Sequence, residues 1–165
     1  MRFIGICILF AVTLATPCRS DDNLKLTVTR EDGSIAFLCE LKDKACFSIY
    51  FSHSVAKSTV EEWFCRKDQD LFLEKTVYHD FGAGLPHDVD SGQSMRVEDG
   101  KIVLDGFHKK LPHFTVRVGR IANHTLSIEE CGKQKKYPLT LFAPPGKPLS
   151  FALTHKSLKG TADEP

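Results

Sequence analysis

The fold is decided by the stretch Phe47–Val55, which reads FSIYFSHSV. Successive side chains point to opposite faces of a strand. The apolar residues and His53 therefore share one face, and Tyr50 shares the other face with the serines. One apolar and one polar face are typical of a strand in an antiparallel sheet that covers a core. The stretch predicts such a strand, with His53 at the end of its apolar row.

Short runs of this kind recur along the chain, with turn residues between them. Asp99-Gly100 separates two of them and is a strong hairpin signal, and no long window carries a helical stripe. We expect an all-β fold, an antiparallel β-sandwich or partly open barrel of about ten short strands. A single domain over residues 21–155 would hold it, followed by a polar tail over 156–165. The strands are predicted over residues 24–29, 35–41, 46–55, 59–66, 71–81, 94–98, 101–107, 114–118, 124–129, 137–142 and 149–153.

The N-terminal segment 1–20 has the form of a secretory signal peptide. Arg2 precedes the apolar run Phe3–Leu14, and small residues lead to Ser20, where we expect cleavage. The apolar run is too short to cross a bilayer comfortably, because a spanning helix needs roughly 20 residues. We expect a periplasmic or secreted protein, with a lipoprotein anchored at Cys18 as the alternative.

The overall charge excludes one class of partner. The 165 residues hold 22 Lys and Arg against 21 Asp and Glu, a formal charge of +1. Removal of segment 1–20 takes away two arginines and leaves a charge of −1. A near-neutral chain creates no field that concentrates a polyanion, so we expect no nucleic-acid partner.

Four cysteines follow the signal segment, namely Cys39, Cys46, Cys65 and Cys131. An even set in an oxidising compartment predicts two disulfides, with three possible pairings. The pairing that we favour joins Cys39 to Cys46 across a polar turn and Cys65 to Cys131. Zinc binding through cysteine is disfavoured because the chain has no C-x₂-C pair.

His53 and Glu62 form the first candidate site. Val60, Glu62 and Phe64 alternate along the next predicted strand, and a short loop would bring Glu62 beside the end of the strand that carries His53. The pair would either line a ligand pocket or act structurally by fixing the strand register. Ser54 cannot act as a nucleophile with His53 as its base, because adjacent strand residues point to opposite faces.

The loop over residues 79–90 is the second candidate site. Gly82 and Gly84 would let the backbone turn its N–H groups toward an anion. Its histidines and aspartates are weak candidates for a divalent metal site, and a tight turn between strands is the simpler interpretation. These candidate ligands are His79, His87, Asp88 and Asp90.

Three motifs together resemble the bacterial family designated domain of unknown function 1850. They are His53-Ser54-Val55, Val60-Glu61-Glu62-Trp63 and Phe81-Gly82-Ala83-Gly84-Leu85-Pro86, and the similarity spans about residues 47–128. Members are small exported proteins, often encoded beside or fused to TRAP transporter subunits of the TAXI type. The resemblance implies an envelope protein linked to tripartite solute uptake and brings no catalytic residues. The carried-over motif positions are His53, Ser54, Val55, Glu62 and Gly82–Gly84.

These observations predict a non-enzymatic accessory or binding protein without a cofactor. Its partners would be subunits of a TRAP-type transporter or a small solute held near His53, Glu62 and the Gly82–Gly84 loop. The alternative is a small periplasmic hydrolase or metal-binding enzyme that uses His53, Glu62 and His79. A third interpretation is a secreted structural domain in which the motifs only set the fold.

Overall fold

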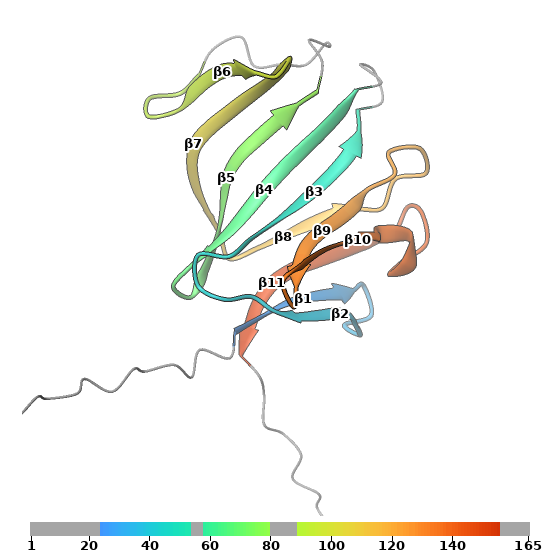
Figure 1. Cartoon of the computed structure of the whole chain (residues 1–165). Coiled ribbons are helices and arrows are strands. Elements are labelled where there is room, and N and C mark those ends of the chain that lie inside the picture. The colour runs from blue at the N-terminus through green and yellow to red at the C-terminus, as the bar shows by residue number, and fades with distance from the viewer. Residues whose placement is uncertain (1–23, 54–57, 80–88, 156–165) are drawn as a thin grey trace, which may run out of the picture.

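The computed structural model describes residues 24–53, 58–79 and 89–155, which form two antiparallel sheets packed face to face (Figure 1). The predicted all-β sandwich is confirmed, and the sheets do not close into a barrel. The small sheet has the strand order β2-β1-β11-β8, and the large sheet has the order β10-β9-β3-β4-β5-β7-β6. No helix among the described residues has the length and apolar character needed to span a bilayer.

The strands have the following bounds. In the small sheet they are β1 (Leu24–Arg30), β2 (Ile35–Glu40), β8 (His113–Arg117) and β11 (Pro148–His155). In the large sheet they are β3 (Cys46–Ser52), β4 (Thr59–Lys67), β5 (Asp70–Tyr78), β6 (Ser94–Glu98), β7 (Lys101–Leu111), β9 (Thr125–Glu130) and β10 (Lys133–Pro138). A short 3-10 helix, η1 (Leu139–Leu141), follows β10.

Stacked phenylalanines join the two sheets. Phe64 of β4 lies 4.2 Å from Phe114 of β8 between ring centroids, and Phe114 lies 4.9 Å from Phe151 of β11. Phe47 of β3 stacks on Phe64 at 5.4 Å. We call the face of the large sheet that carries these rings the inner face and the opposite one the outer face. Burial of such rings is the main stabilising contribution of the core.

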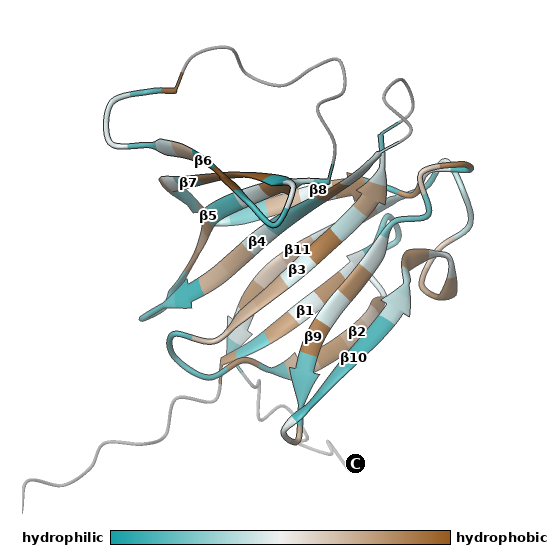
Figure 2. Ribbon diagram, turned by 45° about the horizontal axis from the view of Figure 1, so that its top comes forward, coloured by the Kyte–Doolittle hydropathy of each residue, from teal (hydrophilic) through white to brown (hydrophobic). Residues whose placement is uncertain are grey.

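Hydropathy alternates along the central strands of the large sheet, as the side-chain period of a strand requires (Figure 2). Apolar and polar bands follow one another along β3 and β9, whereas β10 is hydrophilic along most of its length. Strand β10 is an edge strand and carries Lys133, Lys135 and Lys136. Lysines on an edge strand oppose pairing with a second chain.

The predicted strand over residues 137–142 is wrong. Strand β10 begins earlier and ends at Pro138, and η1 follows, in which the Phe142 N–H donates to the Leu139 carbonyl at 3.0 Å. A proline lacks the N–H that would continue a ladder, so the strand ends there. The aliphatic and aromatic residues after Pro138 cover the core from a turn.

The predicted disulfide pairing is also wrong. Cys46 lies directly opposite Cys65 in the register of β3 and β4, and these two form the disulfide. Cys39 belongs to the small sheet and Cys46 to the large sheet, so the segment between them crosses from one sheet to the other and is not a hairpin. Cys39 and Cys131 are free thiols.

Two of the expected segments lie outside the described residues. They are the signal segment 1–20, with the alternative anchor Cys18, and the tail 156–165.

Candidate functional site

His53 and Glu62 both belong to the inner face but do not lie opposite each other. Strands β3 and β4 pair Phe51 with Val60 and Ile49 with Glu62. The His53 N–H donates to the Ser58 carbonyl at 2.8 Å, so the hairpin continues past the strand ends. Glu62 therefore pairs four residues before His53, about 13 Å along the strand. The hairpin register therefore contradicts the expectation that Glu62 lies beside His53.

The Glu62 carboxyl instead has a neighbouring phenol. Thr76 of β5 lies opposite Glu62, and Tyr78 lies opposite Val60, on the same inner face. Burial raises the pKa of the Glu62 carboxyl. Burial first, and then the charge of Glu62, raise the pKa of Tyr78. Both groups are therefore biased toward their neutral, protonated forms.

His79 lies on the outer face and is paired with Glu61. Its Nε2 is 4.0 Å from Glu61 Oε2. The hydroxyl of Ser48 donates to the other oxygen, Glu61 Oε1, at 2.8 Å. An enzyme that used His53, Glu62 and His79 together would need all three on one face, and the alternation of β4 and β5 separates His79 from Glu62.

The Ser48–Glu61 bond is part of a polar row across the outer face. Ser48 lies opposite Ser127 of β9, and both side chains are buried although they face outward. Gln134 of β10 donates to Ser127 Oγ at 2.7 Å. Ser48 donates to the Glu61 carboxylate here, but Ser48 is only 1% exposed, so its hydroxyl is closed to a substrate. The row is a structural link between strands.

A cavity of about 370 Å³ lies on the same face, beside the disulfide. We call it the lysine-rimmed cavity. Lys75 Nζ lies 4.5 Å from the centroid of the Trp63 ring, a cation–π contact. Trp63 Nε1 is buried and has no hydrogen-bond partner among the described residues. The cavity is lined by Lys44, Cys46, Trp63, Cys65, Arg66, Lys67, Glu74 and Lys75.

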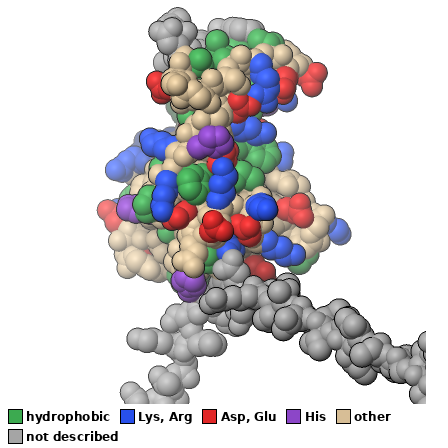
Figure 3. Space-filling view, turned by 90° about the vertical axis from the view of Figure 1, so that its left-hand side faces the viewer, with side chains coloured by type: hydrophobic (Ala, Val, Ile, Leu, Met, Phe, Trp, Pro, Cys, Tyr) green, Lys and Arg blue, Asp and Glu red, His purple; other side chains and the backbone are tan. Residues whose placement is uncertain are grey.

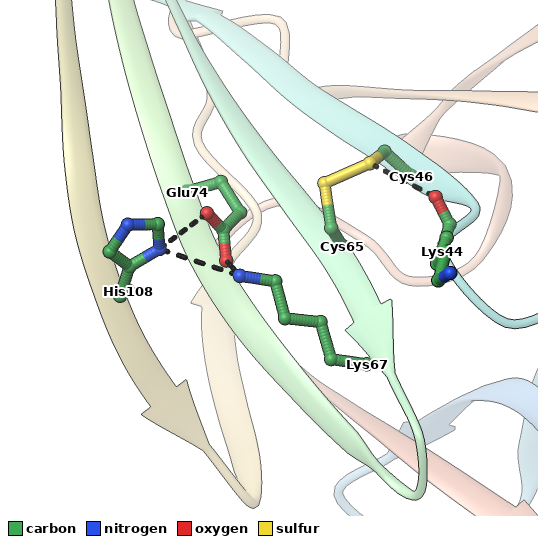
Figure 4. Close-up of a disulfide and its surroundings, with 6 residues drawn as sticks. All are labelled: Lys44, Cys46, Cys65, Lys67, Glu74 and His108. Atoms are coloured by element: carbon green, nitrogen blue, oxygen red, sulfur yellow. Dashed lines mark hydrogen bonds and ion pairs between the residues drawn. A yellow bond between two sulfur atoms is a disulfide. The ribbon is translucent and has the colours of Figure 1, made fainter.

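Most charged groups around the cavity are cations. Figure 4 shows Lys67 reaching toward Glu74, with His108 of β7 on the far side of that carboxylate. Lys67 Nζ is 2.7 Å from Glu74 Oε1, and His108 Nδ1 is 2.8 Å from Glu74 Oε2. Glu74 is the one carboxylate among the described lining residues, and it interacts with Lys67 and His108. Lys44 and Lys75 supply the remaining positive charge at the opening, and Asp105 of β7 lies opposite Lys75.

Arg66 supports the floor of the cavity from inside the sheet. It is 0% exposed and donates to the Leu41 carbonyl through Nη1 and to the Asp68 carbonyl through Nε, each at 2.6 Å. Its positive charge therefore sits beneath the cavity, where surrounding protein screens it less than water would.

Acidic and basic side chains intermingle elsewhere on the surface. From the side of β7, they surround small apolar areas, and no single-sign field covers this face (Figure 3). On β7, Asp105 accepts hydrogen bonds from Ser94 and Arg96, which together with the nearby charges lower the pKa of its carboxyl. The lysine-rimmed cavity is thus a local feature of the large sheet.

Several predicted site residues lie outside the described residues, namely Ser54, Gly82, Gly84, His87 and Asp88. Asp90 is described and belongs to a turn, where its backbone N–H donates to Gln93 Oε1 at 3.2 Å. Within residues 24–53, 58–79 and 89–155, no group of three His, Cys, Asp or Glu side chains could hold a metal ion.

Sequence reasoning did not single out the residues of the cavity. Trp63 was part of a motif, but its role was not separated from that of its neighbours. Alternation places Trp63 and Cys65 on one face of β4, and correct pairing of Cys65 with Cys46 would have drawn attention to that face. Lys44 and Lys75 come from other elements, and only the sheet order brings them together.

A family model described as "Domain of unknown function (DUF1850)" matches residues 47–138, more than half of the chain. The match runs from the second residue of β3 to the end of β10 and so contains the large sheet except Cys46, together with β8. Strands β1, β2 and β11 lie outside it. No curated protein and no solved structure matches the chain.

Proposed function

Because the chain belongs to the family described as a domain of unknown function (DUF1850), a description that assigns no activity, we propose from its geometry that it is a binding protein for an anionic solute. The solute occupies the lysine-rimmed cavity on the outer face of the large sheet. The observation that carries the proposal concerns the part of the chain that the structure describes: there, the buried Trp63 N–H has no partner, and the cavity beside it is lined by four cations and one carboxylate.

The cavity selects its ligand by three features. Lys44 and Lys75 attract an anionic group. Trp63 Nε1 is buried and has no partner within the described chain, so it can donate to that group once a small shift of the ring exposes it. The apolar ring and the disulfide offer contact area to a hydrocarbon or aromatic part of the ligand. A carboxylate or phosphate on a compact organic skeleton fits these features, as in most small-molecule sites that combine an apolar lining with few polar groups.

A binding role is favoured over catalysis by the separation of the reactive side chains. His53 and Glu62 belong to the inner face, and His79 and Ser48 to the outer face with Glu61. Nucleophilic catalysis needs a nucleophile and its base within hydrogen-bond reach. Ser48 and Glu61 do lie within that reach, but Ser48 is 1% exposed and its hydroxyl is closed to a substrate. We therefore infer that the protein does not act as a hydrolase.

We further propose that the protein is exported and serves a tripartite solute transporter of the TRAP type. The support is the form of segment 1–20, the family resemblance and a disulfide of the kind that persists in oxidising compartments. In this role it would hold or pass an anionic solute near the transporter subunits in the periplasm. Anchoring at Cys18 would keep it at the membrane surface.

Trp63 is the one tryptophan in the sequence, so its fluorescence reports on the cavity directly. Full-length protein would be titrated with phosphate, acetate, succinate and benzoate at constant ionic strength, with glucose as a neutral comparison. We expect a saturable change with at least one anion and none with glucose. Lys75→Ala should weaken that binding at least tenfold, and Lys133→Ala on the distant edge strand β10 should leave it unchanged. A fluorescence change that rises linearly with every anion, without saturation, would disprove the anion site. So would a Lys75→Ala protein that binds the anion as tightly as wild type.

The transporter link is tested separately. The processed protein would be mixed with purified subunits of the transporter encoded nearest to it, and complex formation would be measured by pull-down. A gene deletion would be compared with wild type for solute uptake. Absence of a complex together with unchanged uptake would remove the transporter role and leave the solute-binding proposal standing.

A further inference from the structure

The two free cysteines lie at neighbouring edges of the two sheets. Cys39 lies on β2, an edge strand of the small sheet, and Cys131 lies in the turn between β9 and β10 at the edge of the large sheet. Both line the same cavity of about 590 Å³. The two residues are far apart in the sequence, and neither is used by the proposed solute site.

Ring contacts hold the two edges together next to these thiols. Phe37 of β2 lies 5.1 Å from Tyr137 of β10 between ring centroids, so the edge strands of the two sheets pack against each other. Cys39 is two residues beyond Phe37 on β2 and therefore points to the same side of that strand. The Phe37–Tyr137 contact thus directs Cys39 toward the β9–β10 hairpin.

Glu130 is a neighbour of both cysteines. It immediately precedes Cys131, and its Oε2 accepts hydrogen bonds from Tyr137 Oη at 2.9 Å and Lys135 Nζ at 2.7 Å. Burial raises the pKa of the Cys39 thiol to about 11, and the neighbouring Glu130 and Cys131 contribute to the rise. Cys39 is therefore within electrostatic range of both residues of the hairpin.

The backbone of Cys131 is unusual for its residue type. Its φ is +51°, and Gly132 follows with φ +73°. The hairpin between β6 and β7 uses the same geometry with Asp99 and Gly100, at φ +49° and +75°. Aspartate and asparagine tolerate this left-handed conformation better than other side chains, so a cysteine at position 131 lowers the stability of the turn. The stability gained from a disulfide at Cys131 would offset that loss.

We propose that Cys39 and Cys131 form a second disulfide, which ties the edge of the small sheet to the β9–β10 hairpin of the large sheet. The oxidant is a disulfide compound such as oxidised glutathione. The exposed Cys131 thiolate attacks one sulfur of glutathione disulfide, forms a mixed disulfide and releases one glutathione thiolate. Cys39 then gives up its proton, and its thiolate displaces the second glutathione. Two protein thiols are oxidised by two electrons, one glutathione disulfide becomes two glutathione thiols, and these take up the two protons.

The second bond would close the open side of the sandwich. It fixes β2 to β10, whose packing against each other otherwise depends on the Phe37–Tyr137 ring contact. A disulfide across a long loop restricts the unfolded chain, and we expect the oxidised protein to melt about 10 °C above its reduced-pair form.

Peptide mapping tests the bond directly, because trypsin places each of the four cysteines in a different peptide. Full-length protein would be equilibrated with oxidised glutathione, alkylated, digested and mapped without reduction. We expect residues 31–42 linked to residues 121–133, and residues 45–57 linked to residues 58–66. Alkylated Cys39 and Cys131, a lasting glutathione adduct on Cys131, or a link from either cysteine to Cys7 or Cys18 would overturn the proposal.

A matched pair of variants tests the effect on stability. Cys39→Ser/Cys131→Ser should melt about 10 °C below oxidised wild type and should be insensitive to the glutathione ratio. Cys46→Ala/Cys65→Ala keeps the proposed pair and should still form the 31–42 to 121–133 link. If oxidised wild type and Cys39→Ser/Cys131→Ser melt together, the bond either does not form or does not connect the sheets as proposed.

Discussion

Tyr78 and Glu62 lie on the inner face of adjacent strands, and the charge of Glu62 adds to burial in raising the pKa of Tyr78. The carboxyl itself has a raised pKa because burial disfavours its charge. No hydrogen bond or ion pair among the described residues compensates Glu62. The pair is therefore a place where ionisation of one residue works against the stability of the sheet.

Glu62→Gln should stabilise the protein at neutral pH and not in acid. A carboxyl whose pKa is raised on folding binds more protons in the folded state, so stability falls as pH rises from the unfolded pKa through the folded pKa. Below about pH 4 the carboxyl is protonated in both states and this penalty disappears. We expect the melting temperature of Glu62→Gln to exceed that of wild type by a few degrees at pH 7 and to match it near pH 4.

Glu61→Gln is the matched control for this experiment. Glu61 is the preceding residue, but it belongs to the outer face and accepts the Ser48 hydroxyl at 2.8 Å. It should show no stabilisation at pH 7. A Glu62→Gln melting curve that follows wild type at every pH would mean that the carboxyl is well solvated in the folded protein and that folding does not raise its pKa.

Much of the fold could be predicted because each face of a central strand meets a different environment. Alternation in β3 and the Asp99-Gly100 turn between β6 and β7 led to the correct elements. Edge strand β10 was missed because it is exposed on both sides and carries lysines in place of an apolar period. Runs of aliphatic residues after Pro138 suggested a strand that the missing proline N–H does not allow.

The candidate site was harder to predict, since it depends on register and sheet order. Alternation correctly placed His53 and Glu62 on one face. The register was missed because Ser52 pairs with Thr59, with the six residues 53–58 between them. This pairing sets Glu62 opposite Ile49 and not beside His53. The disulfide depends on which sheet each strand joins, and spacing along the chain carries no such information. The lysine-rimmed cavity collects side chains from three separate segments for the same reason.

Arg66→Met should destabilise the protein by about 3 kcal/mol, because it leaves the buried Leu41 carbonyl and the part-buried Asp68 carbonyl without their donor. These carbonyls belong to Leu41, where the chain crosses between sheets, and to Asp68, in the β4–β5 turn. Lys67→Met, at the neighbouring exposed position, should cost less than about 1 kcal/mol. Urea unfolding of both variants measures the difference, and equal midpoints would show that the Arg66 bonds contribute no net stability.

Trp63→Phe should cost less than about 1 kcal/mol, although it removes part of a large ring. The buried Nε1–H has no hydrogen-bond partner among residues 24–53, 58–79 and 89–155, so phenylalanine removes an unsatisfied donor together with some contact area. Phe64→Ala on the inner face should cost about 3–5 kcal/mol through the cavity that it leaves in the phenylalanine stack. Far-ultraviolet circular dichroism in urea follows both. A Trp63→Phe loss as large as that of Phe64→Ala would mean that the indole N–H is bonded in solution.

Gly106→Ala should be far more damaging than Gly100→Ala. Both glycines have a positive φ, +78° and +75°, so alanine at either site has a similar backbone strain of about 1 kcal/mol. A Cβ at Gly100 would meet nothing within 4 Å, whereas a Cβ at Gly106 would run into the carbonyl oxygen of Gly92 and the Cα of Gln93. The backbone before β6 approaches β7 that closely, so it must move to admit a methyl group. We expect Gly106→Ala to lose at least 2 kcal/mol more than Gly100→Ala in urea unfolding. Equal losses would show that the segment around Gly92 yields freely, and that its approach to β7 does not depend on the missing side chain.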